Sequence, residues 1–168
     1  MPITLGLIVV GMIVYFVLLR VRRGSRMVAE VIDMPSDVRT AARRLGYKRR
    51  TDVHPVQGID DPQLALGTLA VAYLSLGKAP TPAAPALLKH DIAQDAEQAR
   101  SMVMLGRWLI RTCDGTQDAV TRVARRLRAL DGGGSVQSLS ALMQDGEEDE
   151  TPAQTAARTE VEGILRPQ

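Results

Sequence analysis

The sequence predicts an all-α protein, with one N-terminal transmembrane helix and a small cytoplasmic bundle of about four to five helices. Residues 3–19, ITLGLIVVGMIVYFVLL, contain no charged side chain. Aromatic residues make up only 3% of the chain, so a core must consist of Leu, Val, Ala, Ile and Met, which favours helices over sheets. After residue 60 the apolar residues recur at helical spacing.

Residues 1–23 are the predicted membrane anchor. As a helix, the 17 uncharged residues from position 3 to position 19 would span roughly 26 Å, close to the hydrocarbon thickness of about 30 Å. A cleaved signal peptide is the alternative, but no basic residue precedes the run and no small-x-small cleavage site follows it. The residues expected to form the anchor are Ile3, Leu7, Val10, Val14, Val17 and Leu18.

Charge predicts the orientation of this anchor. Arginines follow the apolar run directly, and only the terminal amine is positive before it. The positive-inside rule then predicts a single-pass protein of the inner (cytoplasmic) membrane, with the N-terminus outside and the C-terminal domain in the cytoplasm. Residues 20–50 carry ten Lys or Arg against three acidic residues, whereas residues 51–168 carry eleven against sixteen. The basic end therefore adjoins the membrane, where anionic lipid head groups attract it.

Residues 24–59 are predicted to be a basic juxtamembrane helix followed by a linker. Ser36 is expected to cap a helix that ends near Gly46, with Val38 and Ala41 on its apolar side. This helix either lies on anionic lipid, is solvated, or contacts an acidic partner. A basic helix alone is weak evidence for nucleic-acid binding, so no nucleic acid is expected. The candidate lipid-facing arginines are Arg20, Arg22, Arg23, Arg26, Arg43 and Arg44.

Residues 60–144 are the predicted helical bundle. Asp60 or Asp61 is suited to cap a first helix that begins at Pro62 and carries no charge from Gln63 to Gly77. This run is either a core helix or a second membrane span. Its uncharged length of fifteen residues is short for a span, which favours the core.

The most strongly apolar helix of the bundle is expected after Asp95. A turn-rich connector and a short helix through Leu87 and Leu88 precede it. The segment AEQARSMVMLGRWLIRTC is apolar over most of its circumference, which is typical of a helix at the centre of a bundle. Its narrow outer line consists of Arg100, Met104, Arg107 and Arg111.

Two further helices are expected after the turn CDGTQD. The first, DAVTRVARRLRALD, keeps its valines and leucines inward, and its arginine face is either solvated or presses on lipid or on an acidic partner. The second, around 136–143, is short. Residues 145–168 are predicted to be an acidic and largely mobile tail, in which the last apolar residues form at most a docking turn.

The sequence shows no catalytic motif. GxSxG, GxxxxGK[ST], HExxH and paired Cys motifs are all absent, so no catalytic residue, cofactor site or metal site is expected. The single Cys113 falls on the inner stripe of its helix and is expected to be a packing residue. Asp114 and Asp118 flank Gly115 and are the alternative for a hard cation, but helix capping explains both.

Arg107, Trp108 and Arg111 are the candidate partner-binding residues. An amphipathic ring beside arginines is typical of binding hot spots. The alternative for Trp108, the only Trp of the chain, is an anchor of the core. The leading hypothesis for function is a membrane-tethered, non-catalytic interaction module, an accessory or assembly subunit whose partner is an integral membrane protein.

The order of helices after Pro62, with two apolar helices, a DG turn and an amphipathic helix, resembles the tellurite-resistance TerB-like family over roughly residues 60–143. Asp114, Gly115 and Asp118 look like the acidic-glycine turn and following carboxylate of the second half of that family's domain. GKAPTP takes the place of the first copy and has no acidic residue. The resemblance implies a compact helical interaction module at a membrane, with a metal- or stress-responsive binding module as the alternative function.

Overall fold

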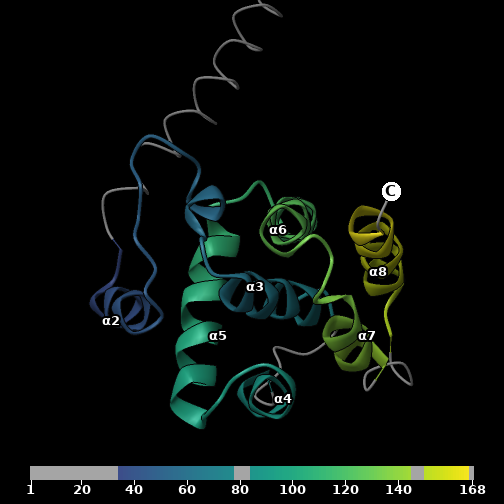
Figure 1. Ribbon diagram of the computed structural model, residues 1–168, viewed down its shortest axis with the longest axis horizontal. Coiled ribbons are helices and arrows are strands. Elements are labelled where there is room, and N and C mark those ends of the chain that lie inside the picture. The colour runs from purple at the N-terminus through teal and green to yellow at the C-terminus, as the bar shows by residue number, and fades with distance from the viewer. Residues whose placement is uncertain (1–33, 78–83, 145–149, 167–168) are drawn as a thin grey trace, which may run out of the picture. The chain divides into compact units, whose positions relative to one another are not determined.

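The computed structural model describes residues 34–77, 84–144 and 150–166, and within them every regular element is a helix (Figure 1). The chain divides into two units, Met1–Met34 and Pro35–Gln168, and all the described helices belong to the second. The predicted all-α class is therefore confirmed for this part of the chain. The elements are α2 (Ser36–Arg44), the 3-10 helix η1 (Pro55–Gly58), α3 (Pro62–Leu74), α4 (Ala84–Asp91), α5 (Ala96–Arg111), α6 (Thr116–Asp131), α7 (Val136–Gln144) and α8 (Pro152–Leu165).

The core is built around α3, which lies between α5 and α6 (Figure 1). Every side chain of α3 from Leu64 to Tyr73 is buried. Gly106 of α5 lets the two helices approach closely, since a Cβ there would lie 3.4 Å from the Cβ of Val71. Of the two alternatives for this uncharged run, the structure shows the core helix. None of the helices within the described ranges combines the length and the apolar character needed to cross a bilayer.

Local capping explains where several helices begin and end. Asp61 caps α3 by accepting a hydrogen bond from the amide of Gln63 at 2.9 Å, and Pro62 is the first helical residue. Asp95 caps α5 by accepting from the amides of two residues in its first turn. The Asp residues predict both of these N-termini, because a cap depends on residues only two or three positions away.

The predicted mobile tail is wrong for residues 152–165, which form α8. Thr151 and Gln154 make a capping box, in which each side chain accepts a hydrogen bond from the amide of the other residue. Ala157, Val161 and Leu165 lie on one face of α8 and are buried. The hydrophobic effect therefore holds this helix on the domain, although the segment 145–168 that contains it is acidic.

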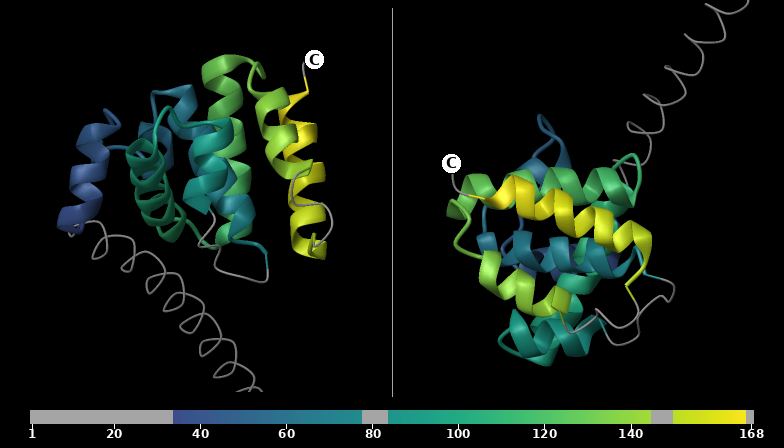
Figure 2. Two further views of the ribbon diagram at one scale, coloured as in Figure 1. Left: turned by 90° about the horizontal axis from the view of Figure 1, so that it is seen from below. Right: turned by 90° about the vertical axis from the view of Figure 1, so that its right-hand side faces the viewer.

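Polar contacts also join α8 to its neighbours. Arg128 of α6 donates to the carbonyl of Ile164 at 2.8 Å, and Thr121 of α6 donates to the carboxylate of Glu160 at 2.5 Å. Figure 2 shows α8 at one side of the domain and α2 at the other. The outermost helices are thus the first and the last of the described unit.

The helix α2 packs against α5 through Val38, Ala41 and Ala42, which are all buried. Its predicted extent is confirmed, since the chain turns at Gly46 with a positive φ of 68°. The predicted cap is wrong: Pro35 holds the cap position and Ser36 is the first helical residue.

The predicted anchor lies outside the described residues. This applies to Ile3, Leu7, Val10, Val14, Val17 and Leu18, and to the candidate lipid-facing residues Arg20, Arg22, Arg23 and Arg26. The anchor and its orientation therefore stay predictions.

Candidate functional site

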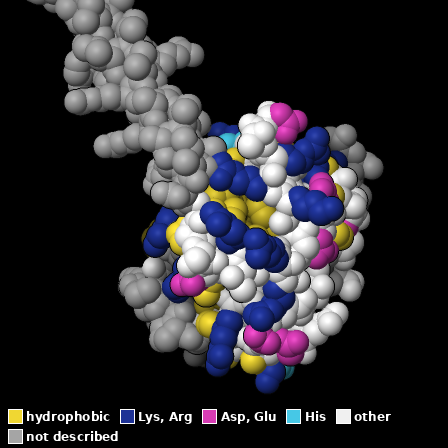
Figure 3. Space-filling view, turned by 90° about the vertical axis from the view of Figure 1, so that its left-hand side faces the viewer, with side chains coloured by type: hydrophobic (Ala, Val, Ile, Leu, Met, Phe, Trp, Pro, Cys, Tyr) yellow, Lys and Arg dark blue, Asp and Glu magenta, His cyan; other side chains and the backbone are white. Residues whose placement is uncertain are grey.

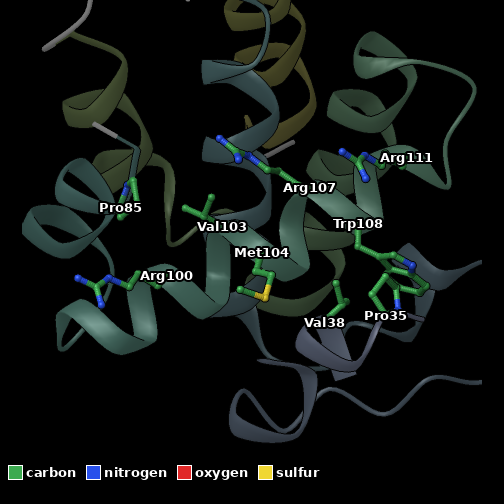
Figure 4. Close-up of a pocket in the computed structure, with 9 residues that line it drawn as sticks. All are labelled: Pro35, Val38, Pro85, Arg100, Val103, Met104, Arg107, Trp108 and Arg111. Atoms are coloured by element: carbon green, nitrogen blue, oxygen red, sulfur yellow. The ribbon is translucent and has the colours of Figure 1, made fainter. Parts of the chain in front are cut away.

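A shallow groove follows the outer line of α5, and we call it the α5 groove. It has a volume of about 420 Å³ and lies between the start of α2 and the start of α4 (Figure 4). All four residues of the outer line predicted for α5 contribute to it. The lining residues are Pro35, Val38, Pro85, Arg100, Val103, Met104, Arg107, Trp108 and Arg111.

The floor of the α5 groove is apolar. Met104 is 40% exposed and is the one large apolar side chain classed as exposed among the described residues. Val103 and Val38 beside it are buried core residues. Only a small part of each side chain contributes to the apolar floor. An exposed methionine on such a floor is typical of surfaces that bind a partner, because its unbranched side chain adapts to different shapes.

Arginines supply the charge of the α5 groove. Arg100, Arg107 and Arg111 are exposed, and none of them makes an ion pair with a described residue. No acidic side chain lines the groove within the described part of the chain. Figure 3 shows Lys and Arg side chains around an apolar area on the side of the domain that carries α2 in Figure 1. The combination favours a ligand that is itself both acidic and apolar.

Trp108 serves the core and the groove together. Its side chain is buried, at 9% exposure, and its ring meets that of Tyr47 edge to face, with centroids 6.4 Å apart. The hydroxyl of Tyr47 donates to the carbonyl of Pro55 at 2.9 Å, and burial raises the pKa of Tyr47 to about 12. The two alternatives for Trp108 are therefore compatible, since one edge of a core residue lines the groove.

One of the candidate lipid-facing residues of α2 makes an exposed contact with α5. Arg44 forms an ion pair with Glu97 of α5 at 2.8 Å and lies 3.4 Å from the hydroxyl of Ser101. Arg43 is exposed and makes no ion pair with a described residue. Arg43 is consequently the better candidate of the two for contact with lipid.

The structure has a second basic site, which the sequence does not predict. The segment 51–57, part of the predicted linker, folds against α6 and together with Arg50 borders a pocket of about 470 Å³, which we call the arginine pocket. The sequence predicts the arginine face of α6. It does not predict the opposite wall of the pocket, because residues 51–61 lack periodicity. The lining residues are Arg50, Val53, His54, Val56, Gln57, Arg122, Arg125, Arg126 and Ala129.

Asp114 and Asp118, the alternative for a hard cation, lie in the turn before α6 and in the first turn of α6, respectively. Asp118 accepts hydrogen bonds from Nε of Arg122 at 2.6 Å and from the amide of Asp114 at 3.2 Å. Burial acts to raise the pKa of Asp118, but these hydrogen bonds outweigh it and hold the pKa below its ordinary value. The predicted capping of α6 by Asp114 and Asp118 is wrong, since Gly115 holds the cap position without a side-chain hydrogen bond and Asp118 lies in the first turn of the helix. Within the described residues, no group of three or more His, Cys, Asp or Glu could hold a metal ion.

Cys113 lies at the end of α5, where its sulfur is 3.5 Å from the carbonyl of Leu109. Burial, and after it the charge of Asp118, raises the pKa of this thiol to about 11. At neutral pH the side chain is therefore a neutral thiol, and the thiolate that a nucleophilic cysteine needs is scarce.

Comparisons with known proteins found no related protein. No protein-family model, curated protein or solved structure matches the chain. The resemblance to the TerB-like family accordingly stays a prediction from the sequence.

Proposed function

We propose that the protein is a membrane-tethered, non-catalytic interaction protein whose helical domain binds an acidic segment of an integral membrane protein in the α5 groove. The observation that carries this proposal is the groove itself. Three arginines without an ion pair to a described residue surround the exposed Met104 and the edge of Trp108. An amphipathic segment with carboxylates on one side would bury its apolar side on this floor and pair its acidic side with the arginines.

The proposed tether rests on residues 3–19 and on the arginines that follow them. Holding the domain at the cytoplasmic face of the inner membrane raises its effective concentration beside a membrane protein, so a weak groove contact suffices for a stable assembly. Membrane anchoring also brings the basic residues of the juxtamembrane region close to anionic lipid head groups.

Site-specific crosslinking tests the groove. A photoreactive amino acid at position 104 of the full-length protein should crosslink in cells to one discrete membrane protein. The double charge reversal Arg107→Glu/Arg111→Glu should abolish this crosslink, because an acidic segment would then meet two carboxylates. Arg125→Glu, which changes an exposed arginine of the arginine pocket, is the matched control and should leave the crosslink unchanged. A crosslink that survives the double reversal would overturn the proposed groove contact.

Alkaline carbonate extraction tests the tether independently. The full-length protein should remain with the membrane pellet, and a variant without residues 1–23 should appear in the supernatant. Release of the full-length protein by carbonate would contradict the tether, whatever the crosslinking experiment finds. No specific observation favours the metal-responsive alternative, since Asp118 is already engaged by Arg122.

A further inference from the structure

The arginine pocket brings four arginines from two parts of the chain to one cavity of about 470 Å³. Arg122, Arg125 and Arg126 come from one face of α6, where residues three and four positions apart are neighbours. Arg50 comes from the opposite wall. No carboxylate lines the cavity among the described residues.

Two of these arginines make contacts with residues that do not line the pocket. Arg126 donates from Nε to the carbonyl of Ile59 at 2.6 Å and from Nη2 to Asp60 at 2.9 Å. Arg122 donates from Nε to Asp118 at 2.6 Å, which leaves both of its terminal nitrogens without a hydrogen bond to any described residue. A guanidinium held at Nε still has its two terminal nitrogens as parallel donors. A ligand that accepts from them therefore costs little further side-chain conformational entropy.

The other two arginines, Arg125 and Arg50, have no close ion pair with a described carboxylate. Arg125 is exposed and makes no ion pair with a described residue. Arg50 has only a long contact to Asp52, at 3.7 Å, and both side chains are more than half exposed. An exposed pair of this kind contributes little, so an anion in the pocket can compete for Arg50.

His54 shapes the wall of the pocket. Its Nδ1 accepts from the amide of Val56 at 3.3 Å, and its Nε2 lies 3.2 Å from the carbonyl of Thr112. With Nδ1 as an acceptor, the proton resides on Nε2 and is donated to Thr112. Because both ring nitrogens are engaged, the side-chain donors left for a ligand are those of the arginines and the amide of Gln57.

We infer that the arginine pocket binds a phosphate group, presented either as soluble phosphate or as the head group of a lipid. Several guanidinium groups around one cavity match the several oxygens and the −1.5 to −2 charge of a phosphate monoester, and the planar fork of Arg pairs bidentately with phosphate. This site is separate from the α5 groove, with which it shares no lining residue.

Calorimetric titration of the full-length protein in a neutral detergent tests this inference. One arm adds inorganic pyrophosphate, and the other adds short-chain phosphatidic acid to the micelles, with short-chain phosphatidylcholine as its reference. Saturable binding in either arm is expected and identifies the source of the phosphate. Arg125→Gln should weaken it about tenfold, since one charge-assisted contact is lost. Arg125 is exposed and unpaired with described residues, so its loss uncovers no buried carboxylate.

Two further variants complete the test. Arg50→Gln, on the opposite wall, should weaken binding in the same direction, whereas Arg107→Gln in the α5 groove should leave it unchanged. Absence of saturable binding in both arms would overturn the inference. Equal weakening by Arg125→Gln and Arg107→Gln would also overturn it, because attraction to the net charge of the domain would then explain the binding.

Discussion

The α5 groove and the arginine pocket are both rich in arginine, but they hold their arginines differently. Arg107 and Arg111 of the groove make no ion pair with a described residue and stand around an apolar floor. Arg122 and Arg126 of the pocket each pair with a carboxylate that does not line it, and they border a more polar cavity. Long unpaired side chains over carbon surface suit an extended segment of varied shape. Fixed guanidinium groups suit a small anion with a defined geometry.

The comparison also separates stability from binding. The floor of the groove includes core residues such as Trp108, which stabilise the fold. Its rim consists of arginines without an ion pair to a described residue, and these do not stabilise it. In the pocket the arginines themselves join distant parts of the chain, since Arg126 connects α6 to Ile59 and Asp60 before α3. Substitutions of the same type should therefore have different effects in the two sites.

Trp108→Ala should have the largest effect on stability. Trp108 is 9% exposed and packs edge to face on Tyr47, so truncation should lower the free energy of unfolding by about 3 kcal/mol. Denaturant titration of the full-length protein in detergent, followed by far-UV circular dichroism, measures this change. Arg125→Ala, on the rim of the pocket, is the control and should stay within about 0.5 kcal/mol. Equal losses in the two variants would show that the groove floor is not part of the core.

Arg126→Gln should lower the free energy of unfolding by about 2 kcal/mol, because the carbonyl of the fully buried Ile59 loses its donor at 2.6 Å. The same substitution at Arg107 of the groove removes no hydrogen bond to a described residue and should not destabilise the protein. Thermal unfolding of both variants under the same conditions checks this difference. If Arg107→Gln proved the more damaging, the proposed division between fixed and unpaired arginines would fail.

Asp118→Asn should lower stability by up to about 1 kcal/mol at pH 7, since its partner Arg122 is 40% exposed and solvent screens the pair. The folded pKa of Asp118 is below its ordinary value. The stabilisation is therefore present above the unfolded pKa of about 3.9 and is lost as pH falls through the folded pKa. Denaturation midpoints of wild type and variant should differ at pH 7, and the difference should shrink as the pH falls below the unfolded pKa of about 3.9 and through the folded pKa. A constant difference would exclude titration of Asp118 as its cause.

The smallest effect is expected from Arg107→Gln, which should raise stability by about 0.3 kcal/mol. Arg107 and Arg111 are four residues apart on α5, and like charges at this spacing repel each other. Raising the salt concentration should remove the gain, since both side chains are exposed. Melting temperatures at about 20 mM and 500 mM NaCl test this. A gain that persists at high salt would point to a cause other than repulsion across the groove.

Much of the helical framework could be predicted because its signals are local. Asp61 and Asp95 start helices through contacts within one turn, and Gly46 ends α2 by adopting a positive φ. The outer line of α5 was also predictable, since a period of 3.6 residues places its members on one face. The capping box of Thr151 and Gln154 is an equally local signal for a helix. The acidic composition of the tail instead favours a mobile segment, which is why α8 is not predicted.

The arginine pocket was not predictable in the same way. Arg50 and Arg125 are far apart in the sequence, and no periodicity indicates that the segment 51–61 folds onto α6. The ion pair of Arg44 with Glu97 likewise joins two helices whose docking no local pattern specifies. Such contacts depend on which faces meet, and this is decided by burial of the whole core.

By itself, the sequence determined the helical class, most helix boundaries and the inward and outward faces of α5 and α6. Caps, turns and periodicity act over three or four residues, so they can be read along the chain. Only the tertiary structure decided that α8 docks through Ala157 and Val161, and that two separate basic sites form. The physical reason is that packing free energy depends on which apolar surfaces become buried against each other, and that pairing is a property of the folded chain.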